Sequence, residues 1–354
     1  MNGNTTRDTL SENEWSPLLE VIVGRAEHSH FPSEPYQHIQ AIMPSQYVDQ
    51  FRPGNPFLES VVEEADKELN NLASLLDLRG IKVHRPRLVD WGKVGGCTGA
   101  MPRDALLVVG DTIIESCFAR KCRRDEVQLA YGDTMDTLQR AKHYNIVRVP
   151  LPEERCDLFR IEESSAEPWQ INDSRPAFDA ADFVRCGNFL VEQQSHVTNR
   201  SGIEYVRRNL PEGYQVVLPE INCPSAMHID ATFLPLRKGL AIYNPLYTSE
   251  KKLRNVKMLE DWQLVSIGKE PRCREWPPLY MTSPEIRMNT LSLDEKTVIV
   301  ENDDLEMVKL FQNLGMDVIT LPFKHVQSLG GSFHCATVDL RRCSPMARSE
   351  EKAA

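Results

Sequence analysis

Residues 105–115 read Ala105-Leu-Leu-Val-Val-Gly-Asp-Thr-Ile-Ile-Glu115, and this stretch decides the fold. Two short apolar runs flank Gly110-Asp111, a pair of residues suited to a tight turn, so the stretch predicts a β-hairpin. Apolar residues at helical spacing follow over residues 125–143, and another apolar run covers 146–150. The order strand, strand, helix, strand predicts a ββαβ unit.

The same order recurs about five times along the chain. Three further copies place their hairpin, helix and last strand at residues 183–192, 202–209 and 215–219, at 232–243, 250–260 and 262–267, and at 290–300, 305–314 and 317–321. The fifth copy combines both ends of the chain. A strand over 18–23 is expected to pair with one over 336–340, and a helix over 58–78 and a strand over 81–84 follow. We therefore predict one closed α/β fold with fivefold pseudo-symmetry, in which each unit covers a sheet edge of its neighbour.

No linker long enough to separate domains interrupts this order, so residues 13–342 are expected to form a single domain. Two separate α/β domains are the alternative, because 354 residues exceed the usual size of one hydrophobic core. Residues 1–12 and 343–354 are polar and are expected to be a disordered N-terminal tail and a polar C-terminal tail.

The composition is that of an ordinary soluble globular protein, with 41% hydrophobic and 26% charged residues. No apolar run approaches the roughly 18 residues that a transmembrane helix needs, so no membrane partner is expected. The first dozen residues contain no apolar signal core, which favours a cytoplasmic location. The formal net charge of −10 argues against nucleic acid as a partner and suits a cationic small-molecule substrate.

The nine cysteines form no Cys-x-x-Cys pair and no zinc-like spacing with histidine. Their odd number argues against a complete disulfide framework, so reduced thiols and no structural metal are expected. The chain also lacks a phosphate-binding glycine loop and a nucleotide fingerprint, so we expect no cofactor.

One cysteine stands out because two glycines precede it, in Leu329-Gly330-Gly331-Ser332-Phe333-His334-Cys335. Glycines let the backbone approach a bound ligand closely, so this thiol is a candidate nucleophile. Its candidate partners lie in Phe178-Asp179-Ala180-Ala181-Asp182 and in Met227-His228-Ile229-Asp230. A Cys/His/Asp set is what covalent attack on an electrophilic carbon requires, although most free cysteines are inert core residues.

These motifs, together with Asn13-Glu14-Trp15, residues 20–26 and Met101-Pro102-Arg103-Asp104, resemble those of the amidinotransferases. This family includes glycine amidinotransferase and the inosamine-phosphate amidinotransferases of antibiotic biosynthesis. The resemblance runs in order from about residue 13 to about residue 342. It implies a five-bladed α/β-propeller, known as the pentein fold, with the active site on its central axis.

The resemblance also implies roles for individual residues. The catalytic triad would be Asp179, His228 and Cys335, with Asp104 and Asp230 binding the guanidinium group. Further substrate-binding positions are Met227, Tyr247, Thr282 and Ser283. Three neighbours of these residues have simpler readings: Asp182 and His334 as structural residues, and Arg103 as an ion-pair partner of Asp104.

The chain departs from the family at two positions. Glycine-type and inosamine-type enzymes have an arginine after the Asn-Pro turn, associated with the α-carboxylate of the donor, whereas here Asn244-Pro245-Leu246 leads to Tyr247. Losing that arginine removes a bidentate carboxylate clamp. Either another cation, such as Arg254 or Lys251, takes over, or the donor lacks an α-carboxylate or binds differently. Ser332 replaces the third glycine of the family's triplet.

The main functional hypothesis is transfer of an amidino group from L-arginine, or a related guanidine, to a primary amine through an S-amidino-cysteine, in specialised-metabolite biosynthesis. Hydrolysis of the same intermediate, as in the related deiminases and dihydrolases, is the second hypothesis, because the same triad supports it. A non-catalytic binding protein on the same fold is the third. Dimerisation is common in similar enzymes, so a homodimer is a further expectation.

Overall fold

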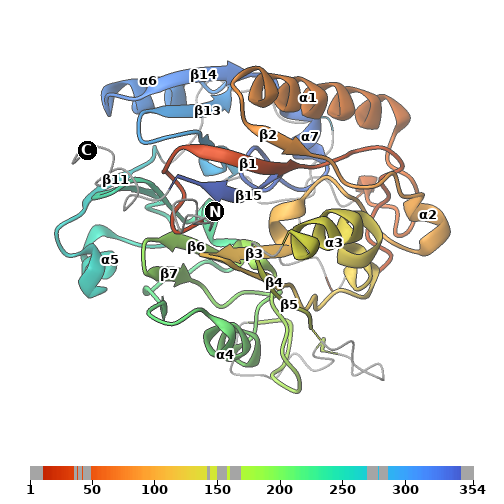
Figure 1. The fold of residues 1–354 in the computed structure, drawn as a ribbon, viewed down its shortest axis with the longest axis horizontal. Helices are drawn as coiled ribbons and strands as arrows, with labels where there is room; N and C mark the ends of the chain where they lie inside the picture. The colour runs from red at the N-terminus through yellow and green to blue at the C-terminus, as the bar shows by residue number, and fades with distance from the viewer. Residues whose placement is uncertain are drawn as a thin grey trace, which may run out of the picture.

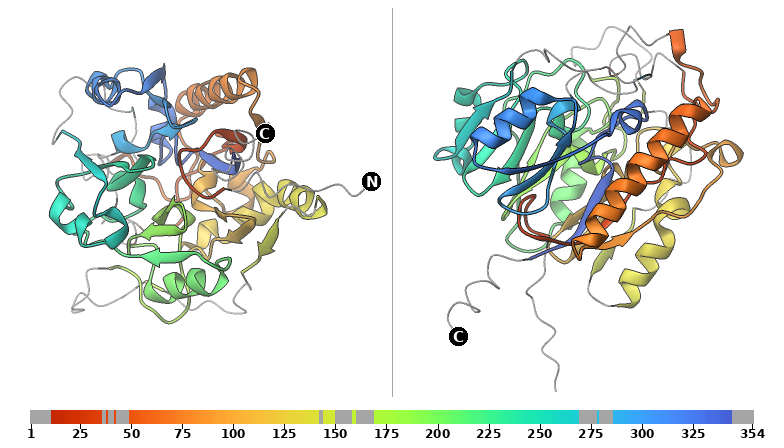
Figure 2. Two further views of the ribbon diagram at one scale, coloured as in Figure 1. Left: turned by 60° about the vertical axis from the view of Figure 1, so that its left-hand side comes forward. Right: turned by 90° about the horizontal axis from the view of Figure 1, so that it is seen from above.

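The computed structural model describes residues 11–35, 38, 42, 49–141, 144–149, 158–159, 169–268, 278 and 286–343. In this part of the chain, five three-stranded sheets are arranged around a central axis (Figures 1 and 2). The middle strand of each sheet pairs antiparallel with one neighbour and parallel with the other. The predicted closed α/β fold of five ββαβ units is confirmed.

Four units are continuous in sequence, and each consists of a hairpin, a helix and a parallel strand. The first two comprise β3 (Leu106–Val109), β4 (Thr112–Glu115), α3 (Gly132–Arg140) and β5 (Asn145–Val147), then β6 (Phe183–Cys186), β7 (Phe189–Glu192), α4 (Arg200–Asn209) and β8 (Gln215–Val217). The next two comprise β9 (Phe233–Arg237), β10 (Leu240–Tyr243), α5 (Glu250–Arg254) and β11 (Gln263–Ser266), then β12 (Leu291–Ser292), β13 (Thr297–Glu301), α6 (Leu305–Asn313) and β14 (Asp317–Leu321).

The fifth unit joins the two ends of the described chain. β1 (Leu18–Val23) pairs antiparallel with β15 (Thr337–Arg342) and parallel with β2 (Lys82–His84). α1 (Glu59–Leu78) connects β1 to β2 and lies on the outside of the ring (Figure 2). Ser11 is buried and bridges Gly110, so the end of the expected disordered tail, which was placed at residue 12, is instead part of the fold. Residues 1–10 and 344–354, most of the two expected tails, lie outside the described residues.

Two helices differ from the prediction. The segment expected to be one helix over 125–143 begins as a π-helix, Val127–Tyr131, and continues as α3. The helix expected over 250–260 ends with α5 at Arg254, and a separate 3-10 turn covers Lys257–Leu259. Asn255 and Val256 separate the two pieces, and both residue types have low helix propensity. Two short helices, α2 (Trp91–Val94) and α7 (Lys324–Ser328), were not predicted.

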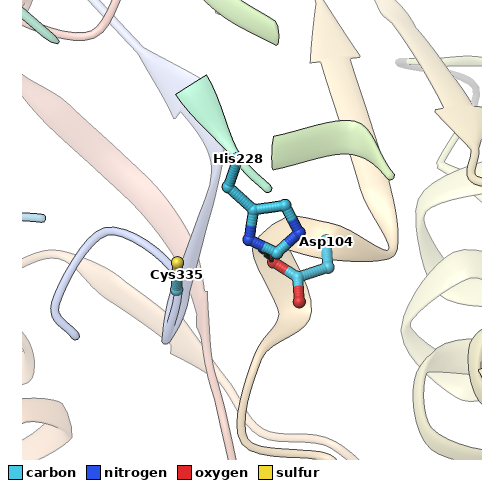
Figure 3. A group of neighbouring side chains, drawn as sticks. All are labelled: Asp104, His228 and Cys335. Carbon is cyan, nitrogen blue, oxygen red and sulfur yellow. Dashed lines mark ion pairs between the residues drawn. The ribbon is translucent and has the colours of Figure 1, made fainter. Parts of the chain in front are cut away.

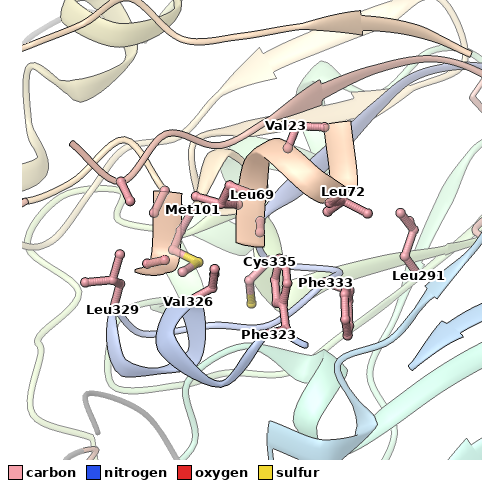
Figure 4. Close-up of a cluster of buried hydrophobic side chains, with 14 of the residues drawn as sticks. Val23, Leu69, Leu72, Met101, Leu291, Phe323, Val326, Leu329, Phe333 and Cys335 are labelled. Atoms are coloured by element: carbon pink, nitrogen blue, oxygen red, sulfur yellow. The ribbon is translucent and has the colours of Figure 1, made fainter. Parts of the chain in front are cut away.

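The long helix α1 packs on the unit that carries the cysteine motif. Its buried residues Ala65, Leu69, Leu72 and Leu76 recur at helical spacing and belong to one hydrophobic cluster. Cys335, in the loop between α7 and β15, belongs to the same cluster (Figure 4). None of the described helices, α1 included, is both long and apolar enough to cross a membrane.

Short 3-10 turns bring the loops of neighbouring units together at the axis. Each turn precedes the first strand of a unit, with at most two residues between them, and the four are Pro102–Asp104, Ala180–Asp182, Ile229–Ala231 and Ile286–Met288. Consecutive turns contact one another. The closed arrangement thus places equivalent positions of the units around one centre.

A buried ion network ties the chain ends to this centre. Glu14 accepts hydrogen bonds from Arg103 at 3.3 Å and from Nη2 of Arg185 at 2.6 Å. Asp339 on β15 accepts from the same two arginines and from Arg342 at 2.8 Å. The expectation that Arg103 pairs with Asp104 is therefore wrong, because its guanidinium points toward Glu14 and Asp339.

We predict that Glu14→Ala strongly destabilises the fold, because it leaves the buried Arg103 and Arg185 without one of their two carboxylates. Breaking such a buried pair typically costs about 3–5 kcal/mol. Urea denaturation followed by circular dichroism would measure the loss. Asp133→Ala, which removes the exposed partner of Arg87, is the control and should change stability far less. Equal losses in the two variants would contradict the role given to the network.

Candidate active site

The functional side chains come from the corresponding loops of successive units, each of which leads into the first strand of its unit. Asp104 ends the first 3-10 turn, Asp179 and His228 each directly precede the next two, and Asn289 directly follows the fourth. Cys335 precedes β15 by two residues. Pseudo-symmetry therefore converts five distant sequence positions into one cluster.

His228 lies at the centre of this cluster. Its Nε2 is 3.1 Å from Oδ2 of Asp179, and its Nδ1 is 3.5 Å from Oδ1 of Asp104 (Figure 3). A carboxylate oxygen of Asp104, a ring nitrogen of His228 and the sulfur of Cys335 lie within 4.8 Å of one another. All four side chains are buried. The residues predicted as a triad, and the predicted neighbour Asp104, are thus in one place.

The backbone of His228 is held in an uncommon conformation, with a φ of 66°. Its N–H donates to Oδ1 of Asp182 at 2.9 Å, and Asp182 also accepts from Ser195 and Thr198. Non-glycine residues with positive φ persist where surrounding contacts compensate, often at functional sites. The carboxylate of Asp182 supports the turn that carries His228, in agreement with a structural role.

Asn289 fixes the position of Cys335. Its Nδ2 is 3.0 Å from Sγ of Cys335, and its Oδ1 accepts the backbone N–H groups of Cys335 and Ser332. Sequence reasoning missed this residue. The available signal was its place in the repeat, since it lies in the loop before the first strand of its unit, as the aspartates and His228 do.

The two glycines before Cys335 are required by geometry. Gly330 has a φ of 122°, which side chains with a Cβ rarely adopt. A Cβ on Gly331 would lie 2.4 Å from Cβ of Cys335 and 2.6 Å from Sδ of Met101. The sequence predicted that the glycine backbone approaches a bound ligand closely. In the structure, the backbone of Gly331 approaches the side chain of Cys335.

Asp230 connects Cys335 to the buried ion network. Its Oδ2 accepts from Asn289 and from Nδ1 of His334, both at 2.7 Å, and lies 3.6 Å from Sγ of Cys335. Nε2 of His334 lies 3.3 Å from Glu14. His334 thus lies behind Asp230 and joins it to the network.

The pKa values of the Cys335 thiol and the His228 imidazole are both raised, and each group affects the pKa of the other. Burial, followed by the charge of Asp230, raises the pKa of the Cys335 thiol to about 12, although His228 counteracts this effect. Burial alone would lower the pKa of His228, but Asp104, Asp179 and the thiol raise it well above its usual value. Both groups therefore hold their protons in the resting site, so His228 is a proton donor there and becomes an acceptor only after it has given up its proton.

Arg123 is a second residue that sequence reasoning missed. Its Nη1 donates to Oδ2 of Asp104 at 2.7 Å and lies 3.6 Å from Asp179, while Nε and Nη2 hold Glu126. Arg123 therefore balances much of the negative charge at the site. Oδ1 of Asp104 nevertheless remains a buried acceptor without a hydrogen bond.

A small cavity of about 40 Å³ reaches the site. Its lining includes Met101, Asp104, Met227, His228 and Gly330. Of the predicted substrate-binding residues, Met227 therefore lines this cavity and Tyr247 does not. Two other predicted substrate-binding residues, Thr282 and Ser283, lie outside the described residues.

Asp104, His228 and Cys335 also offer atom types that can bind a transition metal. Arg123 already neutralises Asp104, and the Asn289 amide already contacts the sulfur. This arrangement suits a nucleophile beside a proton acceptor better than a cation site, so the expectation of a metal-free enzyme stands as a prediction.

Comparisons with known proteins identify relatives of this chain. No protein-family model matches the chain. It is 36% identical over 351 residues to the L-arginine:L-lysine amidinotransferase of Pseudomonas savastanoi pv. phaseolicola, which covers 95% of both chains. It is also 33% identical to mitochondrial glycine amidinotransferase of Danio rerio, over 94% of this chain and 82% of that one.

The chain belongs to the amidinotransferase family. Among solved structures, SxtG, an amidinotransferase of the saxitoxin pathway from Microseira wollei, matches with a TM-score of 0.86. The match has 33% sequence identity and covers 95% of this chain and 98% of that one. This amidinotransferase therefore has the predicted α/β-propeller fold, and it is an enzyme by family.

We predict that alkylation of Cys335 in the resting amidinotransferase by iodoacetamide, a neutral reagent, is slow at pH 7. Because the pKa of the thiol is raised to about 12, the thiolate fraction should rise about tenfold per pH unit and should not level off by pH 10. Peptide mass spectrometry would measure the rate at Cys335, with glutathione as the reference thiol. A plateau at the same pH as glutathione would contradict the predicted state of the thiol.

Proposed function

We propose that this enzyme transfers an amidino group from L-arginine, or a related guanidine, to a primary amine. The observation that carries the proposal is the placement of His228 between two carboxylates and the thiol of Cys335. A guanidinium carbon resists nucleophiles because its positive charge is delocalised over three nitrogens. Catalysis therefore needs groups that hold the guanidinium plane and a nucleophile directed at its carbon.

Asp104 and Asp230 are proposed to bind the guanidinium. Oδ1 of Asp104 lies 3.5 Å from Nδ1 of His228 but accepts no hydrogen bond, and a guanidinium N–H would supply one, which supports this role. Asp230 lies beside the sulfur, so a guanidinium bound between the two carboxylates would present its carbon to Cys335. The bound cation would also stabilise the thiolate, which the resting site disfavours.

In the first half-reaction, the Cys335 thiol loses its proton to solvent as the guanidinium binds, and the thiolate sulfur attacks the central carbon. The protonated His228, oriented by Asp179, then donates its proton to the leaving nitrogen, and the C–N bond breaks. The products are a free amine, ornithine when arginine is the donor, and an S-amidino-cysteine cation. In the second half-reaction, an acceptor amine attacks this carbon and gives a proton to His228, the C–S bond breaks, and the thiolate leaves.

The acceptor decides between transfer and hydrolysis, because water in place of an amine would release urea. Transfer is preferred because the relatives that share a third of their residues with this chain are named amidinotransferases. The name of one relative includes lysine beside arginine, and the name of the other includes glycine. We therefore propose an amino-acid-like primary amine as the acceptor. A cytoplasmic location, a single domain over residues 13–342 and a homodimer remain parts of this proposal.

Intact-protein mass spectrometry after brief incubation with L-arginine and no acceptor tests the proposal. We expect an added amidino mass and released ornithine in the native protein and in Cys343→Ala, and neither in Cys335→Ala. Cys343→Ala is a matched control because it removes a half-buried thiol beyond the last strand. An adduct that persists in Cys335→Ala would refute the assignment of the nucleophile.

The fate of the adduct separates the remaining hypotheses. Clearance by an added amine, with a new guanidino product, is the result expected for a transferase. Clearance by water with formation of urea would instead establish the hydrolase. A wild-type protein that forms no adduct with any guanidine would favour the non-catalytic binding protein.

A further inference from the structure

A second and larger cavity lies beside the candidate active site. Its volume is about 380 Å³, and its cationic lining residues are Arg87, Arg120, Lys121, Arg124, Arg148 and Arg175. The acidic ones are Glu115, Asp125 and Asp136. The local excess of positive charge is opposite in sign to the net charge of −10 of the whole chain.

Three of the lining arginines are already paired with carboxylates. Arg87 pairs with Asp133, Arg124 lies 3.3 Å from Asp125, and Arg148 lies 3.4 Å from Asp136. These pairs lie at the surface and balance their own charge, so they leave little attraction for an anion in the cavity.

Arg120 and Arg175 differ from the other arginines. Nη2 of Arg120 donates to the thioether sulfur of Met227 at 3.1 Å. Nη1 of Arg175 donates to the carbonyl of Pro176 and contacts the sulfur of Cys117, and its Nε is buried without a hydrogen bond. Within the described part of the chain, neither arginine pairs with a carboxylate. A half-buried guanidinium held by sulfur and carbonyl atoms retains most of its capacity to bind an anion.

The position of Arg120 connects this charge to the chemistry. Arg120 lines both the large cavity and the small cavity that contains Asp104 and His228. Its contact Met227 is the residue next to His228. A substrate whose guanidinium lies at Asp104 could therefore extend its other end toward Arg120 and the large cavity.

The usual carboxylate clamp of the family is missing at Tyr247, and Tyr247 lines neither cavity. We propose that Arg120 and Arg175 bind the α-carboxylate of the amino-acid substrates and that the large cavity holds their non-reacting end. This inference rests on the proposed function. Arg120 and Arg175 are thus specificity-determining residues, and the ligand class is an α-amino acid with a guanidine or amine at its far end.

The test compares two donors that differ only in the carboxylate. The rate of adduct formation on Cys335 is measured against rising concentrations of L-arginine and of agmatine, which has the same guanidine but no carboxylate. In Arg120→Gln and Arg175→Gln, the L-arginine concentration that gives half-maximal rate should rise about 10- to 100-fold, the range expected for a lost charge-assisted bond. The maximal rate and the response to agmatine should remain unchanged, and Arg120→Lys should restore part of the loss.

Two controls keep the result interpretable. Arg207→Gln removes a cation that is paired with Glu204 and lines neither cavity, so its response to both donors should match the wild type. Thermal unfolding confirms that each variant is folded. Equal effects on the two donors, or none, in Arg120→Gln and Arg175→Gln would overturn the inference while leaving transfer intact. A wild-type enzyme that is modified by neither donor would refute the proposed use of arginine and this inference with it.

Discussion

The constraint on which the rest of the structure depends is the burial of Glu14 between Arg103 and Arg185. Removing these charges from water is costly, so the arrangement is stable only when every partner is in place. The partners come from the N-terminal segment, the first 3-10 turn, β6 and β15, through Asp339. The network therefore forms only when the propeller is closed, and it selects the closed arrangement over partly open ones.

The same network orients the reactive group. Glu14 contacts His334, His334 contacts Asp230, and the Asn289 amide bridges Asp230 and the sulfur of Cys335. The nucleophile is thereby held by a chain of buried polar contacts that begins at the point where the two chain ends meet. Stability and site geometry are coupled, so losses in the network should affect both.

The hydrophobic pattern was sufficient to predict the fold class. Hairpins around Gly110, Gly187 and Gly239 have glycine at positive φ, and the alternation of hairpin, helix and strand leaves few other topologies. Element ends were less predictable, because a π-helix before α3 and the division after α5 depend on packing. The candidate triad was predicted from short motifs that resemble those of the amidinotransferases. Asn289 and Arg123 were missed, because their roles arise from contacts between units.

The sequence by itself determined the five ββαβ units, the glycines beside Cys335 and the set of residues able to do nucleophilic chemistry, because these follow from local propensity and residue type. Only the tertiary structure decided which of these residues meet. Closure of the ring placed Arg103 against Glu14 rather than its neighbour Asp104, and it placed Arg123 beside Asp104. It also placed Arg120 between two cavities. Ion pairing inside a protein follows distance in space, and residues adjacent in sequence can point in different directions.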